Sequence, residues 1–262
     1  MAFDGLTALA GVLVGTIVGI TGVGGGSLMT PILVLMFGVA PQTAVGTDLL
    51  YACITKTFGV AIHHKNETVD WQVVRRLAMG SLPGAALTLF WMRMNDMSQM
   101  KSGVILTALA FALILTALGI VFKDGLHAIG RRFRIGDSDR FIALQPPLTV
   151  ASGVMLGVLV TLTSIGAGAL GTVVLLYLYP LRMTPSRLVG TDLAHAIPLA
   201  LVAGMGHLLL GNVNFGLLLN LLLGSIPGVI VGSWVSTRAP LTFMRYAIAL
   251  VLGAVAAKLL SV

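Results

Sequence analysis

The sequence has few charged residues, and this scarcity excludes an ordinary water-soluble domain. Only 10% of its 262 residues are charged and 57% are hydrophobic, with a mean hydropathy of +1.00. About a quarter of the residues in a soluble domain are charged. A chain with so little charge needs lipid around much of its surface, so the sequence predicts an integral membrane protein.

Short alternating strands are also missing, which excludes a transmembrane β-barrel. The apolar runs are long and continuous, as in residues 104–122, so we expect an all-α, polytopic transmembrane protein. The single cysteine, Cys53, excludes an intrachain disulfide. The net charge of +7 does not indicate nucleic-acid binding, because the basic residues cluster between apolar runs, where they set topology.

Motifs for catalysis are lacking as well. The sequence contains no phosphate-binding loop, metal-ligand cluster or nucleophile motif, so we expect neither an enzyme, nor a cofactor, nor a metal site. The first four residues include no basic residue and are followed by no clear cleavage site. We therefore expect the first apolar segment to be retained rather than removed as a signal peptide.

An internal repeat organises the chain. Residues 45–49 read Val-Gly-Thr-Asp-Leu, and the same five letters return at residues 189–193, 144 positions later. One fixed offset through several separate blocks is a strong repeat signal. The same offset also relates Gly22-Val23-Gly24 to Gly166-Ala167-Gly168, Pro41 to Pro185, His63 to His207, Val69-Asp70-Trp71 to Val213-Asn214-Phe215, and residues 80–84 to residues 224–228.

The repeat predicts three parts: a first transmembrane repeat (residues 1–122), a basic cytoplasmic linker (123–145) and a second transmembrane repeat (146–262). Each repeat has five apolar segments. With the basic loops placed inside by the positive-inside rule, an odd number of segments inverts the second repeat. This assignment puts both termini on the non-cytoplasmic side. The result is two inverted repeats with broken or short helices, an architecture typical of secondary transporters.

The apolar sequence of the first repeat is interrupted at two places. The first repeat has a glycine-rich break at residues 22–26, followed by a short apolar segment, residues 27–39. This segment is either a tilted short helix or part of a re-entrant hairpin. The fourth apolar segment, about residues 73–92, is interrupted at residues 80–84, where Pro83 between Gly80 and Gly84 predicts a kink.

The glycine breaks are the predicted binding elements. Irregular backbone at membrane depth is tolerated where it is buried in protein or lines a watery cavity. A helix that restarts after a break presents free N–H groups to an anion, and matched breaks in both repeats indicate a transporter site. Packing of helices through glycine is the alternative. The residues expected to bind substrate here are Gly24, Gly25, Gly26, Ser27, Ser164, Gly166, Gly168, Gly171 and Thr172.

The aspartates of the repeated block carry a second hypothesis. A carboxylate in hydrocarbon costs about 2.5 kcal/mol or more, so Asp48 and Asp192 need a reason to be there. Thr47 and Asp48, like Thr191 and Asp192, cap a helix start, fix the neighbouring glycine-rich break, or handle a coupling H⁺ or Na⁺. Two alternatives stay open: an intramembrane aspartyl protease, which needs adjacent carboxylates, and a passive anion channel.

Two further polar residues lie on the apolar segments. Lys56 follows Asp48 by two helical turns and has no charged counterpart, since Ala200 takes its place in the second repeat. It could neutralise Asp48 through a partner, reach toward the interface, or bind an anion. His195, the counterpart of Tyr51, follows Asp192 by three residues and is either a proton carrier or a hydrogen-bonded core residue.

The glycine-rich block leading to Pro31, and the block from Pro41 to Asp48, together resemble the TauE/SafE family of sulfite exporters, also called the toluene sulfonate uptake permease family. Their repetition in the second half completes the resemblance, which covers nearly the whole chain. It implies two related halves and a sulfite, sulfonate or other organosulfur anion as the substrate. The second glycine block, Gly166-Ala167-Gly168 leading to Gly171, departs from the stronger first one.

Together these observations predict a secondary transporter. It would move sulfite or a small organosulfur anion across the cell (inner) membrane by alternating access, in the direction of export. The sequence does not define an oligomeric state, a coupling ion or a single substrate.

Overall fold

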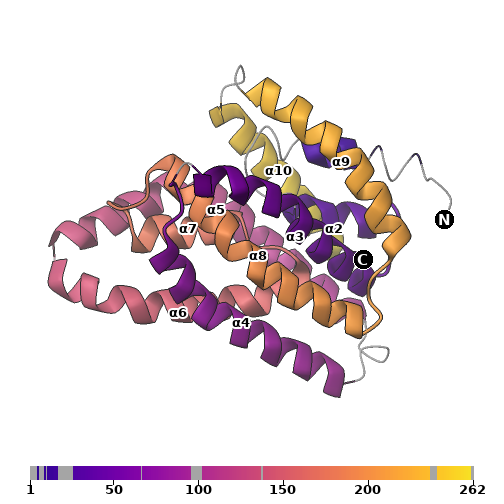
Figure 1. The fold of residues 1–262 in the computed structure, drawn as a ribbon, viewed down its shortest axis with the longest axis horizontal. Helices are drawn as coiled ribbons and strands as arrows, with labels where there is room; N and C mark the ends of the chain where they lie inside the picture. Colours follow the sequence, from indigo (N-terminus) through magenta and orange to yellow (C-terminus); the bar gives the residue numbers. More distant parts are fainter. Residues whose placement is uncertain are drawn as a thin grey trace.

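The chain forms helices connected by short turns, as shown by a computed structural model (Figure 1) that describes residues 5, 9, 11–16, 26–65, 67–95, 102–136, 138–236 and 241–260. This confirms the all-α fold class. Among the described helices, three are long and apolar enough to cross a membrane, within Ile105–Phe122, Phe141–Thr163 and Pro185–Leu209. The helices are α2 (Gly26–Leu35), α3 (Pro41–Lys65), α4 (Trp71–Met94), α5 (Ser102–Gly136), α6 (Ser138–Thr163), α7 (Ala169–Leu178), α8 (Pro185–Leu209), α9 (Phe215–Ser236) and α10 (Leu241–Leu260).

Side-chain caps start helices at matched places in the two repeats. Asp70 Oδ1 accepts the backbone N–H of Val73 (3.3 Å) at the start of α4. Its counterpart Asn214 accepts the N–H of Leu217 (3.0 Å) at the start of α9. Such caps satisfy N–H groups that have no partner within the helix.

Short and broken helices occur where the sequence predicts them. Residues 11–16 are helical, and with α2 to α5 they match α6 to α10 of the second repeat. Both α2 and α7 have ten residues, about half the length that spans a bilayer. The block at residues 80–84 does not interrupt its helix, because α4 continues through Pro83, while the kink expected there stays a prediction.

Contacts between the repeats are exchanged in matched pairs. The Asp70 N–H donates to Thr191 Oγ1 (3.0 Å), and the Asn214 N–H donates to Thr47 Oγ1 (3.1 Å). Each contact is the counterpart of the other. A mutual exchange of this kind is what a twofold relation between two units produces.

The equivalent helices α3 and α8 pack against each other at the centre of the molecule (Figure 1). Gly46 lies against the His207 side chain, and Gly204 lies against Leu50. Residue numbers therefore rise along α3 in the direction in which they fall along α8. The two equivalent helices are therefore antiparallel, which is consistent with inverted repeats.

Glycines allow helices of different repeats to touch through their backbones. In α4, Gly80 faces the carbonyl oxygen of Val150 in α6, and in α6 Gly157 faces that of Ser81. The matched contact joins α9 to the first helix, where Gly15 faces the carbonyl oxygen of Ser225. A Cβ at these positions would clash, so the glycines of residues 80–84 serve close packing rather than a break.

The basic segments predicted to share one membrane face lie together. Residues 123–145, expected as a linker, occupy the end of α5 and the start of α6, with residue 137 outside the described part. Gln145 donates to the carbonyl oxygen of Leu178 (2.6 Å). Arg182, in the turn after α7, pairs with Asp70 before α4. The grouping agrees with the charge-based topology, while the assignment of this face to the cytoplasm stays a prediction.

Candidate functional site

The two aspartates lie inside their helices and not at the helix starts. Helix α3 begins at Pro41 and α8 at Pro185, so Asp48 and Asp192 each follow the first residue of their helix by seven positions. The hypothesis that they cap their own helices is therefore wrong. Both carboxylates are buried, and each faces the short helix of its own repeat, as the next contacts show.

The Asp48 carboxylate is held by one hydroxyl group, with a second hydroxyl nearby. Thr30 of α2 donates to Asp48 Oδ2 at 2.6 Å. Ser164, from the break of the second repeat, lies beside the same carboxylate, but Ser164 Oγ and Asp48 Oδ1 each lack a hydrogen-bond partner. Asp48 thus joins the first repeat to the second break and keeps one buried oxygen unsatisfied.

Asp192 faces the N-terminus of α7. Its carboxylate accepts the backbone N–H of Gly168, the residue that precedes α7. A Cβ on Gly171, in the first turn of the same helix, would collide with Asp192 Oδ1. The anion position that we predicted at this helix start is therefore occupied by a carboxylate of the protein itself.

The break between α6 and α7 has a backbone that favours glycine. Ser164 has φ 59°, Gly166 has φ 123° and Gly168 has φ 140°, values that side chains disfavour. Thr172 bonds back to the carbonyl oxygen of Gly168 and so stabilises the first turn of α7. Broken backbone at this depth is buried within protein, as the sequence predicts.

Lys56 lies between the two aspartates. Its side chain is buried, with 6% exposed, and Nζ donates to the carbonyl oxygen of Ala167 at 2.7 Å. The ammonium also interacts electrostatically with Asp192 and Asp48. Of the roles considered from sequence, reaching toward the interface is wrong, because the lysine is enclosed by protein.

Lys56 is also close to the axis that relates the repeats. The α3–α8 register pairs Gly46 with His207 and Leu50 with Gly204, which puts Lys56 opposite residues 197–198. Its own counterpart, Ala200, is within one turn of that point. A residue that faces its counterpart lies near the symmetry axis, so the Lys56 ammonium lies close to this axis, with the uncharged Ala200 as its counterpart.

The same register separates the two carboxylates. It puts Asp192 opposite residues 61–62 of α3, about 13 residues from Asp48, or about 20 Å along the helix at 1.5 Å per residue. Two carboxylates that share one catalytic water must lie within hydrogen-bonding reach of it. The geometry argues against the aspartyl protease alternative.

His195 is a buried hydrogen-bonded residue. Its Nε2 lies 2.9 Å from Ser81 Oγ in α4, while Nδ1 has no partner. The matched pair in the other direction is Tyr51 with Ser225 of α9. His195 therefore ties α8 to α4 as Tyr51 ties α3 to α9, and its proton role stays a prediction.

The first glycine break is only partly described. Gly24 and Gly25 lie outside the described residues. Gly26 begins α2, and Ser27 follows in that helix, with a side chain that lies outside the described part.

Sequence reasoning missed two partners of the site. The first is Thr30, the partner of Asp48, which has no polar counterpart because Val174 takes its place in the second repeat. The second is the carbonyl oxygen of Ala167, the partner of Lys56, which belongs to the backbone and leaves no signal in the residue type. The cue available for Thr30 was a hydroxyl on the short segment that follows the glycine break.

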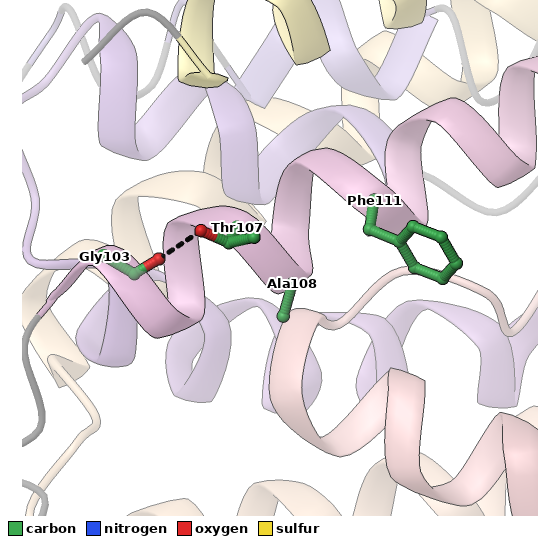
Figure 2. Close-up of a pocket in the computed structure, with 4 residues that line it drawn as sticks. All are labelled: Gly103, Thr107, Ala108 and Phe111. Atoms are coloured by element: carbon green, nitrogen blue, oxygen red, sulfur yellow. Dashed lines mark hydrogen bonds between the residues drawn. The ribbon is translucent and has the colours of Figure 1, made fainter.

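A separate pocket lies on the outer side of α5 (Figure 2), lined by Gly103, Thr107, Ala108 and Phe111. Figure 2 shows that the one hydroxyl, on Thr107, is bonded back to the carbonyl oxygen of Gly103 (2.7 Å). The lining residues carry no charge, so this pocket lacks the chemistry to hold an anion.

The whole chain is similar to known membrane transporters. A family profile described as "Sulfite exporter TauE/SafE" matches residues 7–259. The chain is 41% identical to "Probable membrane transporter protein YjnA" of Bacillus subtilis (strain 168), over 94% of this chain and 96% of the relative. It is 27% identical to "Probable membrane transporter protein YdhB" of the same organism, over 90% and 91%. No solved structure matches the chain.

Proposed function

Because the chain belongs to the sulfite exporter TauE/SafE family of membrane transporters, we propose that it moves sulfite or a small organosulfur anion, such as an organosulfonate, across the cell (inner) membrane. The observation that carries the proposal is the buried Lys56 ammonium bonded to Ala167 of the second glycine break. A buried cation next to a helix N-terminus is the chemistry that recognises a small oxyanion.

The substrate occupies the space between Lys56 and the start of α7. There it competes with the Asp192 carboxylate for the backbone N–H of Gly168. Lys56 then exchanges its bond to the Ala167 carbonyl for one to a substrate oxygen. Substrate binding is thereby linked to a rearrangement of the second break.

The transport cycle follows from the repeat. Two inverted halves that pack through α3 and α8 rock about the site at their interface, so that it opens to one face at a time. The proposed direction is export, from the face that carries the basic loops. Asp48, with its unsatisfied oxygen, is the proposed position for a coupling H⁺ or Na⁺, and His195 is the second residue proposed for a coupling proton.

Flux into liposomes tests the function. Purified protein is reconstituted, and uptake of labelled sulfite and of a small sulfonate is measured with and without a pH gradient and with and without Na⁺. We expect saturable uptake that K56M reduces at least tenfold. R131M, which removes an exposed positive charge on α5, serves as the matched control. Absence of flux for every sulfur oxyanion would overturn the substrate assignment.

The same liposomes separate a carrier from a passive anion channel. A carrier loaded with unlabelled substrate exchanges it for labelled substrate outside, so internal substrate accelerates uptake. A channel shows conductance without this acceleration. We expect exchange, and conductance without exchange would favour the channel.

A further inference from the structure

A polar network closes one end of the α3–α8 interface, and it has no charged equivalent at the other end. Arg182 Nη2 donates to Asp70 Oδ1 (2.9 Å) and to Gln72 Oε1 (2.9 Å). Arg182 Nε lies 2.5 Å from Asp70 Oδ2. The ion pair therefore ties the turn after α7 to the start of α4.

A second set of bonds supports the same tie. Tyr179, in the same turn, receives a hydrogen bond from Arg76 of α4 (3.1 Å). Its hydroxyl also lies 2.8 Å from Thr149 of α6. Three segments are thus joined at this face by side chains that can separate without breaking a helix.

The repeat supplies an internal comparison. At the 144-residue offset, Asp70 corresponds to Asn214 and Arg182 to Gly38. Asn214 still caps its helix and still donates its N–H to the threonine of the other repeat. Capping and the contact between the repeats therefore do not need a charge at this position, so the Asp70 carboxylate serves another purpose. The other members have uncharged counterparts too: Gln72, Arg76, Thr149 and Tyr179 correspond to Gly216, Asn220, Gly5 and Leu35.

The network is directly connected to the site. The backbone N–H of Asp70 donates to Thr191, the residue before Asp192. Below it, Val69 and Val74 form a buried apolar cluster with Ala194 of α8. An opening of the Asp70–Arg182 pair would therefore expose the α8 segment that carries Asp192.

We propose that the Asp70–Arg182 ion pair is a one-sided gate, which closes the Asp192 end of the pathway and breaks when the transporter opens to the face of the basic loops. The proposal rests on alternating access by the proposed function. It assigns positioning roles to Asp70 and Arg182, which act on access to the site rather than on the substrate.

Thiol labelling tests the gate without relying on transport. The reporter is A194C in a C53A background, which removes the single native cysteine. Ala194 is buried, so labelling by a membrane-impermeant charged thiol reagent reports opening. We expect D70N, which installs the residue found at Asn214, and R182Q to accelerate labelling at least fivefold from the basic-loop face alone. Vesicles of both orientations distinguish the faces.

Two variants control the interpretation. N214D alters the matched position at the other end and should leave the labelling rate unchanged. The charge reversal D70R/R182D should label more slowly than either of its single substitutions, because it restores an ion pair. Unchanged labelling in D70N, or equal acceleration from both faces, would overturn the gate. If D70N accelerates labelling while no variant transports a sulfur anion, the gate stands and the substrate assignment fails.

Discussion

Lys56 of the first repeat donates a hydrogen bond from Nζ to the carbonyl oxygen of Ala167, in the glycine break of the second repeat, over 2.7 Å. The bond crosses the interface between the repeats close to the axis that relates them. A substrate that competes for this ammonium acts directly on the contact between the two halves. Substrate recognition and the relative position of the halves are therefore linked at a single side chain.

The pseudo-symmetry predicts that the charge of Lys56 can be moved. K56A should lower anion flux at least tenfold, because the buried positive charge is lost. The double substitution K56A/A200K returns an ammonium to the equivalent position on α8, near the same axis. We expect it to recover part of the flux, measured in liposomes beside the two single variants.

Equal flux in K56A/A200K and K56A would contradict this prediction if the double variant is folded. Folding is checked by its elution from a sizing column and its thermal unfolding in detergent. Such a result would show that the position of the buried positive charge, and not only its presence, decides the flux.

Gly171 predicts a steric effect at the second aspartate. A Cβ there would collide with Asp192 Oδ1, so G171A must displace the carboxylate from the start of α7. We expect a loss of stability of about 1–3 kcal/mol, typical of overpacking, together with a loss of flux. G253A on α10 is the control, since a Cβ at Gly253 meets no atom within 4 Å.

The outcome of this pair is read from thermal unfolding in detergent and from flux. G253A should stay within about 1 kcal/mol of the parent, the scale of a glycine-to-alanine change in a helix. If G171A were as stable and active as G253A, the position of the Asp192 carboxylate against α7 would be needed neither for stability nor for flux.

Much of the fold follows from the sequence because it depends on composition and periodicity. Low charge indicated a membrane protein, and the 144-residue offset identified equivalent helices, including the short α2 and α7. The block at residues 80–84 was expected to interrupt its segment, but α4 continues through it. A glycine permits either a break or a close approach between helices, and only the position of Val150 in α6 distinguishes the two.

The site was less predictable because its contacts join the two repeats. The repeat indicated that Asp48 and Asp192 are equivalent, yet their surroundings differ: hydroxyls of Thr30 and Ser164 for one, a backbone N–H of Gly168 for the other. The Asp70–Arg182 pair spans 112 positions of the sequence. It could have been suspected from Asp70 standing opposite Asn214 in the repeat and from the positive-inside grouping of both turns.

The matched hydrogen bonds of Thr47 and Thr191 should contribute comparably to the stability of the protein. Each hydroxyl accepts a backbone N–H from the other repeat, from Asn214 and Asp70 respectively. T47V and T191V each remove the acceptor of a backbone N–H, in a part-buried bond at Asn214 and a buried bond at Asp70. A buried N–H without an acceptor costs about 1–3 kcal/mol. We expect similar losses of thermal stability for the two variants and recovery in T47S and T191S. Losses that differ by more than about 2 kcal/mol would contradict the energetic equivalence of the repeats.

The two aspartates predict opposite effects on anion binding and coupling. Asp192 occupies the start of α7 where the substrate is proposed to bind, so D192N removes a competing negative charge. The dissociation constant for sulfite should fall, on the order of tenfold, which corresponds to about 1.4 kcal/mol. Titration calorimetry or ligand-dependent thermal stabilisation in detergent measures this constant.

In D48N, an amide oxygen can still accept the Thr30 hydroxyl that now bonds Oδ2, so we expect a folded protein whose sulfite affinity changes little. Its flux should lose the response to the pH or Na⁺ gradient, because the charge proposed to hold the coupling ion is absent. Undiminished, gradient-driven flux in D48N would remove Asp48 from the coupling mechanism, and weaker sulfite binding in D192N would show that Asp192 supports the anion site instead of competing for it.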